Sequence, residues 1–191
     1  MKVNRLLVVL VCLVAVATFA DDKNDAEKKK TEIRQMSEQT LARLYEVKPS
    51  AKAAVANAYG YAVFSNLGVK ILVGGSGNGK GLAVNNHDKS EIFMKMLEIQ
   101  AGLGMGVKKF RVIFVFENQK AFDGFVNSGW EFGGQASAAA KTSPEKGGSM
   151  EGAASVSEGV WMYQLTDKGL ALELTGKGTK YSKDDKLNQK S

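Results

Sequence analysis

The sequence predicts an α+β domain in which N-terminal helices precede a mainly antiparallel, glycine-rich β-sheet. Helical periodicity runs from Asp25 to Val47, and short apolar runs rich in β-branched and aromatic residues follow Gly60. One short helical segment, 119–127, is inserted among those runs. Many strands with few, short helices are typical of an antiparallel sheet packed against helices. A barrel-like closure of this sheet is one expected form.

The first twenty residues have the pattern of an export signal. Two basic residues precede an apolar run, Leu6–Val16, and the small residues Thr18 and Ala20 fit a cleavage site. We therefore predict a signal peptide over 1–20 and an exported protein, located in the periplasm or cell envelope or outside the cell. An uncleaved N-terminal anchor is the alternative, although the apolar run is short for a membrane span.

The composition of the chain without its signal limits its size, its partners and its disulfides. Without the signal, 171 of the 191 residues remain, which is enough for one domain with a hydrophobic core. They include 24 basic and 20 acidic residues, so the formal charge falls from +6 to +4. This balance permits an anionic partner without requiring one, and we expect no nucleic-acid partner. The only cysteine, Cys12, lies in the signal, so no disulfide is expected.

The segment 21–50 is predicted to be an amphipathic helix followed by a break at Pro49. Its apolar residues recur at steps of three and four, and its charged residues lie elsewhere. Such a helix lies on a membrane surface or, more commonly, packs its apolar stripe on its own domain. Ser50 is a suitable cap for a second, alanine-rich helix over 51–58.

Glycines recur at every second position from Gly75 to Gly81, which is the side-chain period of a strand. They therefore fall on one face of a strand, where a groove for a ligand or close packing by a neighbouring element are the two alternatives. The expected strands lie near 59–65, 69–75, 81–85, 91–107, 110–116 and 130–140, followed by a closing hairpin of 156–165 with 170–175 and a flexible tail at 182–191.

Two motifs suggest chemistry and fail on inspection. The segment GGSGNGKG at 74–81 is one residue short of a phosphate-binding loop, because Gly81 replaces the required hydroxyl and a strand follows instead of a helix. His87 is the only histidine and lies in a polar turn, so a zinc cluster or a Ser–His–Asp site has no support. We predict no catalytic residues, no metal site and no cofactor.

Four blocks in succession resemble the SYLF lipid-binding domain family across 51–181. They are AVFSNLGVKILVGGSGNGKGLAV, LEIQAGLGMGVKKFRVIFVFENQKAFDGF, GWEFGGQASAAA and VWMYQLTDKGLALELTGKGTKY. Ser65 departs from the family pattern, which usually has proline there, and the loop 142–152 does not align. The resemblance implies a non-catalytic domain that binds phospholipid, with phosphoinositide preference and actin association in eukaryotic members. An exported single domain looks like the bacterial branch, for which we do not expect actin.

The resemblance also implies the partner, an anionic phospholipid membrane, and the kinds of residue that contact it. An amphipathic helix would use Ile33, Met36, Leu41 and Leu44. A basic surface would use Lys70, Lys80, Lys108, Lys109, Arg111, Lys177 and Lys180. The alternative is a soluble envelope domain that binds a protein partner or another copy of itself. An enzyme is a third hypothesis, and it would need an acid cluster around a pocket.

Overall fold

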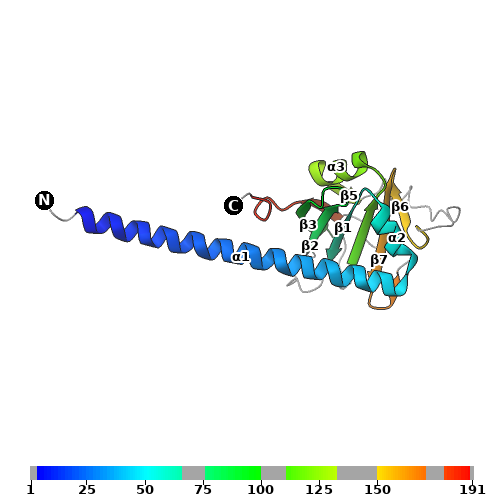
Figure 1. The fold of residues 1–191 in the computed structure, drawn as a ribbon, viewed down its shortest axis with the longest axis horizontal. Coiled ribbons are helices and arrows are strands. Elements are labelled where there is room, and N and C mark those ends of the chain that lie inside the picture. Colours follow the sequence, from blue (N-terminus) through cyan, green and yellow to red (C-terminus); the bar gives the residue numbers. More distant parts are fainter. Residues whose placement is uncertain (1–3, 66–75, 100–110, 133–149, 171–178, 190–191) are drawn as a thin grey trace.

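The chain forms three helices and a 9-stranded sheet in a computed structural model that describes residues 4–65, 76–99, 111–132, 150–170 and 179–189. Two helices, α1 (Asn4–Val47) and α2 (Ser50–Asn57), precede the sheet, and α3 (Gln119–Ser128) is inserted between its strands. The predicted α+β class is confirmed. Figure 1 shows α3 on one side of the strands and α1 crossing on the other side.

Every strand pair in the sheet is antiparallel. The order is β5-β9-β3-β2-β1-β4-β7-β6, with β8 also paired to β7. The strands are β1 (Gly60–Ser65), β2 (Ser76–Asn85), β3 (Glu91–Ile99), β4 (Arg111–Phe116), β5 (Trp130–Phe132), β6 (Ala154–Ser157), β7 (Val160–Thr166), β8 (Gly169–Leu170) and β9 (Thr179–Lys183).

The sheet curls around an aromatic core. Five strand-to-strand steps separate β5 from β4, which in a flat sheet would place them roughly 24 Å apart. Yet the ring centroids of Trp130 on β5 and Phe114 on β4 are 5.5 Å apart, and those of Tyr181 on β9 and Phe114 are 5.0 Å apart. The concave inner face therefore closes on itself, and Phe125 of α3 packs into it.

The described strand glycines of the inner face pack internally. A Cβ on Gly81 would lie 2.6 Å from the carbonyl oxygen of Val63 and inside the ring of Phe64, its cross-strand partner. A Cβ on Gly79 would meet the side chain of Met96. Large neighbours thus fill the space that the missing side chains leave. Of the two alternatives for the glycine face, close packing is the one found at these positions.

The convex outer face is covered by α1 and α2. Leu44 of α1 and Val55 of α2 pack with Val63, Ile113 and Tyr163 of the sheet in one buried cluster. With 44 residues, α1 is about 66 Å long, so its N-terminal part extends beyond the sheet (Figure 1). The predicted signal peptide falls in that part, and its cleavage stays a prediction. Across the described ranges, no helix combines the length and apolar character that crossing a membrane requires.

Local structure differs from the sequence-based expectation at two places and agrees with it at a third. Helix α2 has Pro49 as its N-cap, and the Ser50 hydroxyl is buried and makes no hydrogen bond among the described residues. The expected strand 156–165 is a hairpin of β6 and β7, because Gly159 takes φ 68° in the turn. The expected helix 119–127 is confirmed as α3, which is capped by Asn118 and ends before Gly129.

The expected flexible tail at 182–191 is ordered over its described residues, 182–189. Its first two residues belong to β9, and Leu187 is buried beside α1. The Asn188 side chain then continues the ladder, because its amide donates to the Phe93 carbonyl (2.7 Å) and its oxygen accepts from the Phe93 N–H (3.0 Å). The sequence-based assignment was therefore wrong here. Expected strand residues at 69–75, 100–107, 133–140 and 171–175 lie outside the described ranges.

Candidate functional site

The four apolar residues of the predicted lipid-binding helix lie against the sheet. Ile33 is 3% exposed and Leu44 0%, and Met36 and Leu41 are half-buried against the same outer face. The helix thus packs its stripe on its own domain, the commoner of the two arrangements considered above. In this conformation the stripe contacts lipid only if the helix moves, and its lipid role stays a prediction.

Of the predicted basic surface, the structure brings three residues to one face of the sheet. Lys80 lies in β2, Arg111 begins β4, and Ser65 of β1 pairs with both of them. Residues directly opposite one another on neighbouring strands share a face, so Lys80 and Arg111 belong to one row. The same rule places Lys180 on this face, because it pairs with Leu97 of β3. Lys70, Lys108, Lys109 and Lys177 lie outside the described ranges.

Two further residues complete this surface, and the sequence-based reasoning missed both. Lys95 of β3 pairs directly with Lys80, and Leu97, two residues further along β3, shares their face. Leu97 is the one large hydrophobic side chain among the described residues that is exposed, at 39%. We call Lys80, Lys95, Leu97 and Lys180 the basic surface patch. The strand alternation was visible in the sequence, but the register that brings Lys95 opposite Lys80 was not.

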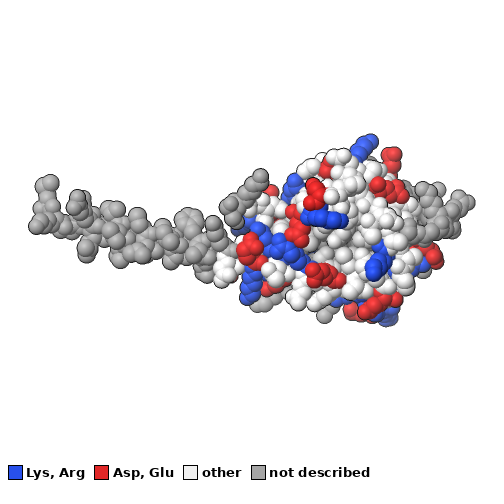
Figure 2. Space-filling model, viewed as in Figure 1, with Lys and Arg blue, Asp and Glu red and all other residues white. Residues whose placement is uncertain are grey.

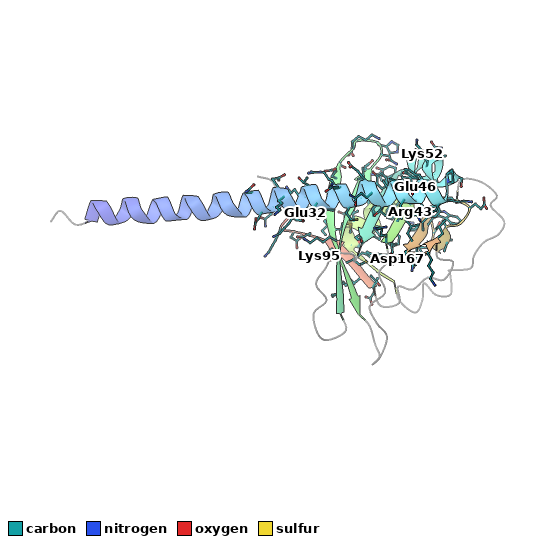
Figure 3. All side chains as sticks on the ribbon, turned by 90° about the horizontal axis from the view of Figure 1, so that it is seen from below. Glu32, Arg43, Glu46, Lys52, Lys95 and Asp167 are labelled. Carbon is teal, nitrogen blue, oxygen red and sulfur yellow. The ribbon has the colours of Figure 1, made fainter. Side chains whose placement is uncertain are left out.

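The basic surface patch lies on the outer face, beside α1. In Figure 3, Lys95 lies to one side of α1, where the strands extend past the helix. Lys80 and Lys95 belong to the next row of the sheet after Leu82 and Phe93, which the helix covers. The outer face therefore changes from a helix-covered apolar region to an exposed basic one within two residues of each strand.

Little negative charge compensates the basic surface patch. Within the described parts of the chain, no ion pair or hydrogen bond is made by the side chains of Lys80, Lys95 or Lys180. Directly opposed like charges on neighbouring strands destabilise a sheet by roughly 0.2–1 kcal/mol. Glu131 of β5 pairs in register with Lys180 and is the nearest acid along the row. The paired lysines are thus positioned to attract an anion from solution.

Net charge alone does not single out a binding face. On the side that Figure 2 shows, basic and acidic residues are interspersed where α1 meets the domain. Elsewhere on the described surface, charged side chains pair with each other, as Arg34 does with Glu91 (2.8 Å) and Lys48 with Glu151 (2.8 Å). The lack of such ion pairs among the described residues, rather than the overall positive charge, distinguishes the basic surface patch.

The near-miss phosphate loop lies in a strand, and the single histidine lies in an exposed turn. Lys80 and its flanking glycines lie within β2, so they do not open a helix whose amides could hold phosphate. His87 is exposed in the β2–β3 turn, where its ring lies 4.6 Å from that of Tyr59. Among the residues described, no group of three or more His, Cys, Asp or Glu side chains could hold a metal ion.

A separate hollow of about 260 Å³ lies at α3, between the helix and the β6–β7 turn. Phe125, Trp130 and Val160 form its apolar wall, and Lys120 and Glu158 lie at its rim. Glu158 is its only carboxylate among the described residues, whereas acid–base catalysis by paired carboxylates needs two. The described lining of the hollow therefore lacks the pair of carboxylates that this kind of catalysis needs.

Two comparisons with known proteins bear on the family of the chain. Residues 97–191 match the Ysc84 family model, described as "Las17-binding protein actin regulator". The curated protein "Beta cell expansion factor A" from Aeromonas veronii, a SYLF family member, is 32% identical over 166 residues. That alignment covers 87% of this chain and 61% of the relative, so the chain spans less than two thirds of the relative's length. The chain is a member of the SYLF family.

Proposed function

We propose that this chain is a non-catalytic, exported domain that binds anionic phospholipid at a membrane surface through the basic surface patch. The observation that carries the proposal is the direct opposition of Lys80 and Lys95 beside the exposed Leu97, without a paired acid among the described residues. Family membership supports a lipid-binding or actin-regulatory domain in general terms, and this surface favours the first.

The expected strength of the contact follows from its charges. Each lysine near an anionic membrane contributes about 1 kcal/mol, so Lys80 and Lys95, which have no acid opposite them, together contribute about 2 kcal/mol. That corresponds to roughly a thirtyfold gain in affinity over a neutral surface. Leu97 adds apolar area at the centre of the same surface. Such binding weakens with salt, because the lysines lie on the surface and the Debye length is only about 8 Å at physiological ionic strength.

A purely protective role explains these lysines less well. Lysines on edge strands commonly prevent a sheet from pairing with another chain. Both β2 and β3 are interior strands, because each has hydrogen-bonded neighbours on its two sides. No edge therefore needs protection at Lys80 or Lys95, and their opposition only costs stability there.

The names of the similar proteins describe other settings. The family model refers to Las17 binding and actin regulation, and the curated relative is described as a beta cell expansion factor. The matched segment begins at Leu97, so it excludes Lys80, Lys95 and α1. Actin is not part of the proposal, because the N-terminal pattern favours export.

The test is co-sedimentation of residues 21–191, the chain expected after cleavage of the signal, with vesicles at low and moderate salt. Neutral vesicles of phosphatidylcholine are compared with vesicles that also contain phosphatidylglycerol. We expect binding to the anionic vesicles only, and weaker binding at the higher salt. The Lys80→Glu/Lys95→Glu double variant should lose at least tenfold in affinity, because each reversal replaces an attraction by a repulsion.

The matched control is Lys52→Glu/Lys120→Glu, which changes the net charge equally at exposed sites on α2 and α3. It should lose less than threefold. Equal losses in the two double variants would show that only net charge matters and would refute this binding surface. If the unaltered chain binds neither kind of vesicle, the alternative of a protein partner or self-association takes precedence, and size-exclusion chromatography tests it next.

A further inference from the structure

The contacts of α1 with the sheet fall into two clusters, which share the half-buried Met36. Ile33, near the beginning of the contact, packs with Leu82, Phe93 and Leu187. Leu44, near the end of the helix, belongs to the larger cluster that also includes α2. The two helix residues buried between them are polar, Ser37 and Thr40. We call residues 24–36 the α1 arm, because this part of the helix contacts the smaller cluster, which includes no residue of α2.

Cationic side chains hold the α1 arm on the sheet. The Nε of Arg34 lies 2.8 Å from a carboxylate oxygen of Glu91, and both side chains are partly exposed. The guanidinium of Arg34 also lies 5.1 Å from the ring centre of Phe93, and the Lys30 ammonium lies 5.8 Å from it. Exposed ion pairs and cation–π contacts of this kind are individually weak. An arginine that leaves such contacts can bind a phosphate group in a bidentate manner.

The α1 arm covers apolar residues that adjoin the basic surface patch. Leu82 and Lys80 are neighbours on the outer face of β2, because they are two residues apart along the strand. Phe93 and Lys95 are neighbours on the same face of β3. Leu82 and Phe93 are each 4% exposed beneath the arm. If the arm moved aside, these two residues would extend the exposed Leu97 into a larger apolar area beside the lysines.

Leu82, Phe93 and Leu187 form an apolar seat beneath the α1 arm, and contacts outside the arm hold this seat in place. Leu187 is positioned by a turn in which Asp184 accepts hydrogen bonds from the N–H groups of Leu187 and Asn188. The Asp184 N–H donates to the Phe93 carbonyl (3.0 Å), and the Asn188 side chain bonds both backbone groups of Phe93. This turn belongs to β9 and its continuation, so it can keep its shape when the arm leaves.

We propose that the seat formed by Leu82, Phe93 and Leu187 is a second, covered membrane-contact site, whose occupant is the interfacial acyl region of an anionic bilayer. The inference rests on the proposed function. Anionic headgroups attract the basic surface patch first and then compete with Glu91 and Phe93 for Arg34 and Lys30. The α1 arm then leaves the sheet, and the apolar seat enters the membrane interface. Binding thus has a salt-sensitive first step and a salt-resistant second step.

A reversible covalent lock tests the second step. The double variant Ile33→Cys/Leu82→Cys of residues 21–191, which contain no other cysteine, joins two positions of the same cluster. Thiol titration verifies that the disulfide forms. With phosphatidylglycerol vesicles, the oxidised variant should bind at low salt as the reduced one does, but retain at least fivefold less protein after a high-salt wash. Equal retention in both forms would overturn the proposal while leaving the proposed function intact.

A lipid-free measurement tests whether the α1 arm detaches separately. Arg34→Glu places two acids together across the arm and β3, whereas the control Arg43→Glu disturbs a pair with Glu46 on the helix itself. Hydrogen–deuterium exchange should rise at least tenfold over 24–36 in Arg34→Glu and stay unchanged over 40–47. The control should show no such localised rise. Exchange that rises equally over both segments would contradict a separate arm. Failure of the unaltered chain to bind any vesicle would instead overturn the proposed function.

Discussion

The two faces of the sheet are built from different side chains and serve different ends. The inner face is a continuous aromatic core in which Phe64, Phe114 and Tyr181 contact one another, with centroid separations between 4.7 and 6.0 Å. The outer face is discontinuous. Its apolar residues form two clusters under α1, and they give way to Lys80 and Lys95 where the helix no longer covers the strands.

Under the proposed function, this difference places stability and membrane binding on different faces of the sheet. A face that closes on itself buries its residues on every side, so substitutions there are costly. A face that helices cover only in part has a boundary, and residues at that boundary can change without disturbing the core. The comparison predicts that the effect on stability falls from the aromatic core to the α1 contact and then to the basic surface patch.

The largest loss of stability is expected at the centre of the inner face. Phe114→Ala removes a fully buried ring that contacts five other aromatic rings, those of Phe64, Phe116, Phe125, Trp130 and Tyr181. The expected decrease in the free energy of unfolding is about 3–5 kcal/mol. Urea titration followed by circular dichroism measures it. A loss below about 1 kcal/mol would mean that the inner face repacks freely and is not the rigid part of the fold.

The outer face should show two different responses along α1. Leu44→Ala creates a cavity in the larger cluster and should cost about 3 kcal/mol of unfolding free energy. Ile33→Ala affects only the small cluster beneath the α1 arm, where the arm can adjust, and should cost about 2 kcal/mol or less. Thermal and urea unfolding of both variants compare them. A larger cost for Ile33→Ala would reverse the ranking of the two clusters.

Alkaline pH should weaken the outer face through its tyrosines. Burial, with a smaller contribution from Glu151, raises the pKa of Tyr163 from 10.0 to about 12, and burial also raises the pKa of Tyr61. Because the folded state holds these protons more tightly, their contribution to stability is complete below pH 10. It is lost as the pH rises from 10 through 12. Melting temperatures between pH 8 and 12 should fall over that window, and less steeply in Tyr163→Phe. A pH-independent melting temperature would contradict this.

Local sequence signals were sufficient for the helices and for much of the strand content. The helical spacing of Phe122, Phe125 and Val126 before Gly129 predicted α3 almost to the residue. The β6–β7 turn was missed because Glu158–Gly159 interrupts the apolar pattern only briefly. The pairing of β3 with β9 joins segments more than 80 residues apart, and no local pattern encodes that contact.

The candidate site was predicted in its residue type but not in its membership. Lys80, Arg111 and Lys180 were expected to be basic surface residues, and the register places them on one face. Lys95 and Leu97 were missed because their neighbours are known only once β2 and β3 are aligned. The α1 stripe was recognised, yet periodicity is the same for a helix that contacts lipid and one that contacts its own sheet.

The smallest effect on stability is expected in the basic surface patch, where the effect on binding should be largest. Leu97→Ala and Lys95→Ala remove exposed side chains, so each should change the free energy of unfolding by no more than about 0.5 kcal/mol. Lys95→Ala also removes its repulsion with Lys80, which favours a slight gain. In vesicle co-sedimentation, Lys95→Ala should lose roughly fivefold in affinity, as expected for one lysine near an anionic surface.

Phe114→Ala supplies the opposite case, provided that it is assayed well below its own melting temperature. There it should keep its affinity despite its lower stability, because its ring lies on the other face of the sheet. A Lys95→Ala variant that loses stability but binds normally would place both properties on the same face and remove the distinction between them.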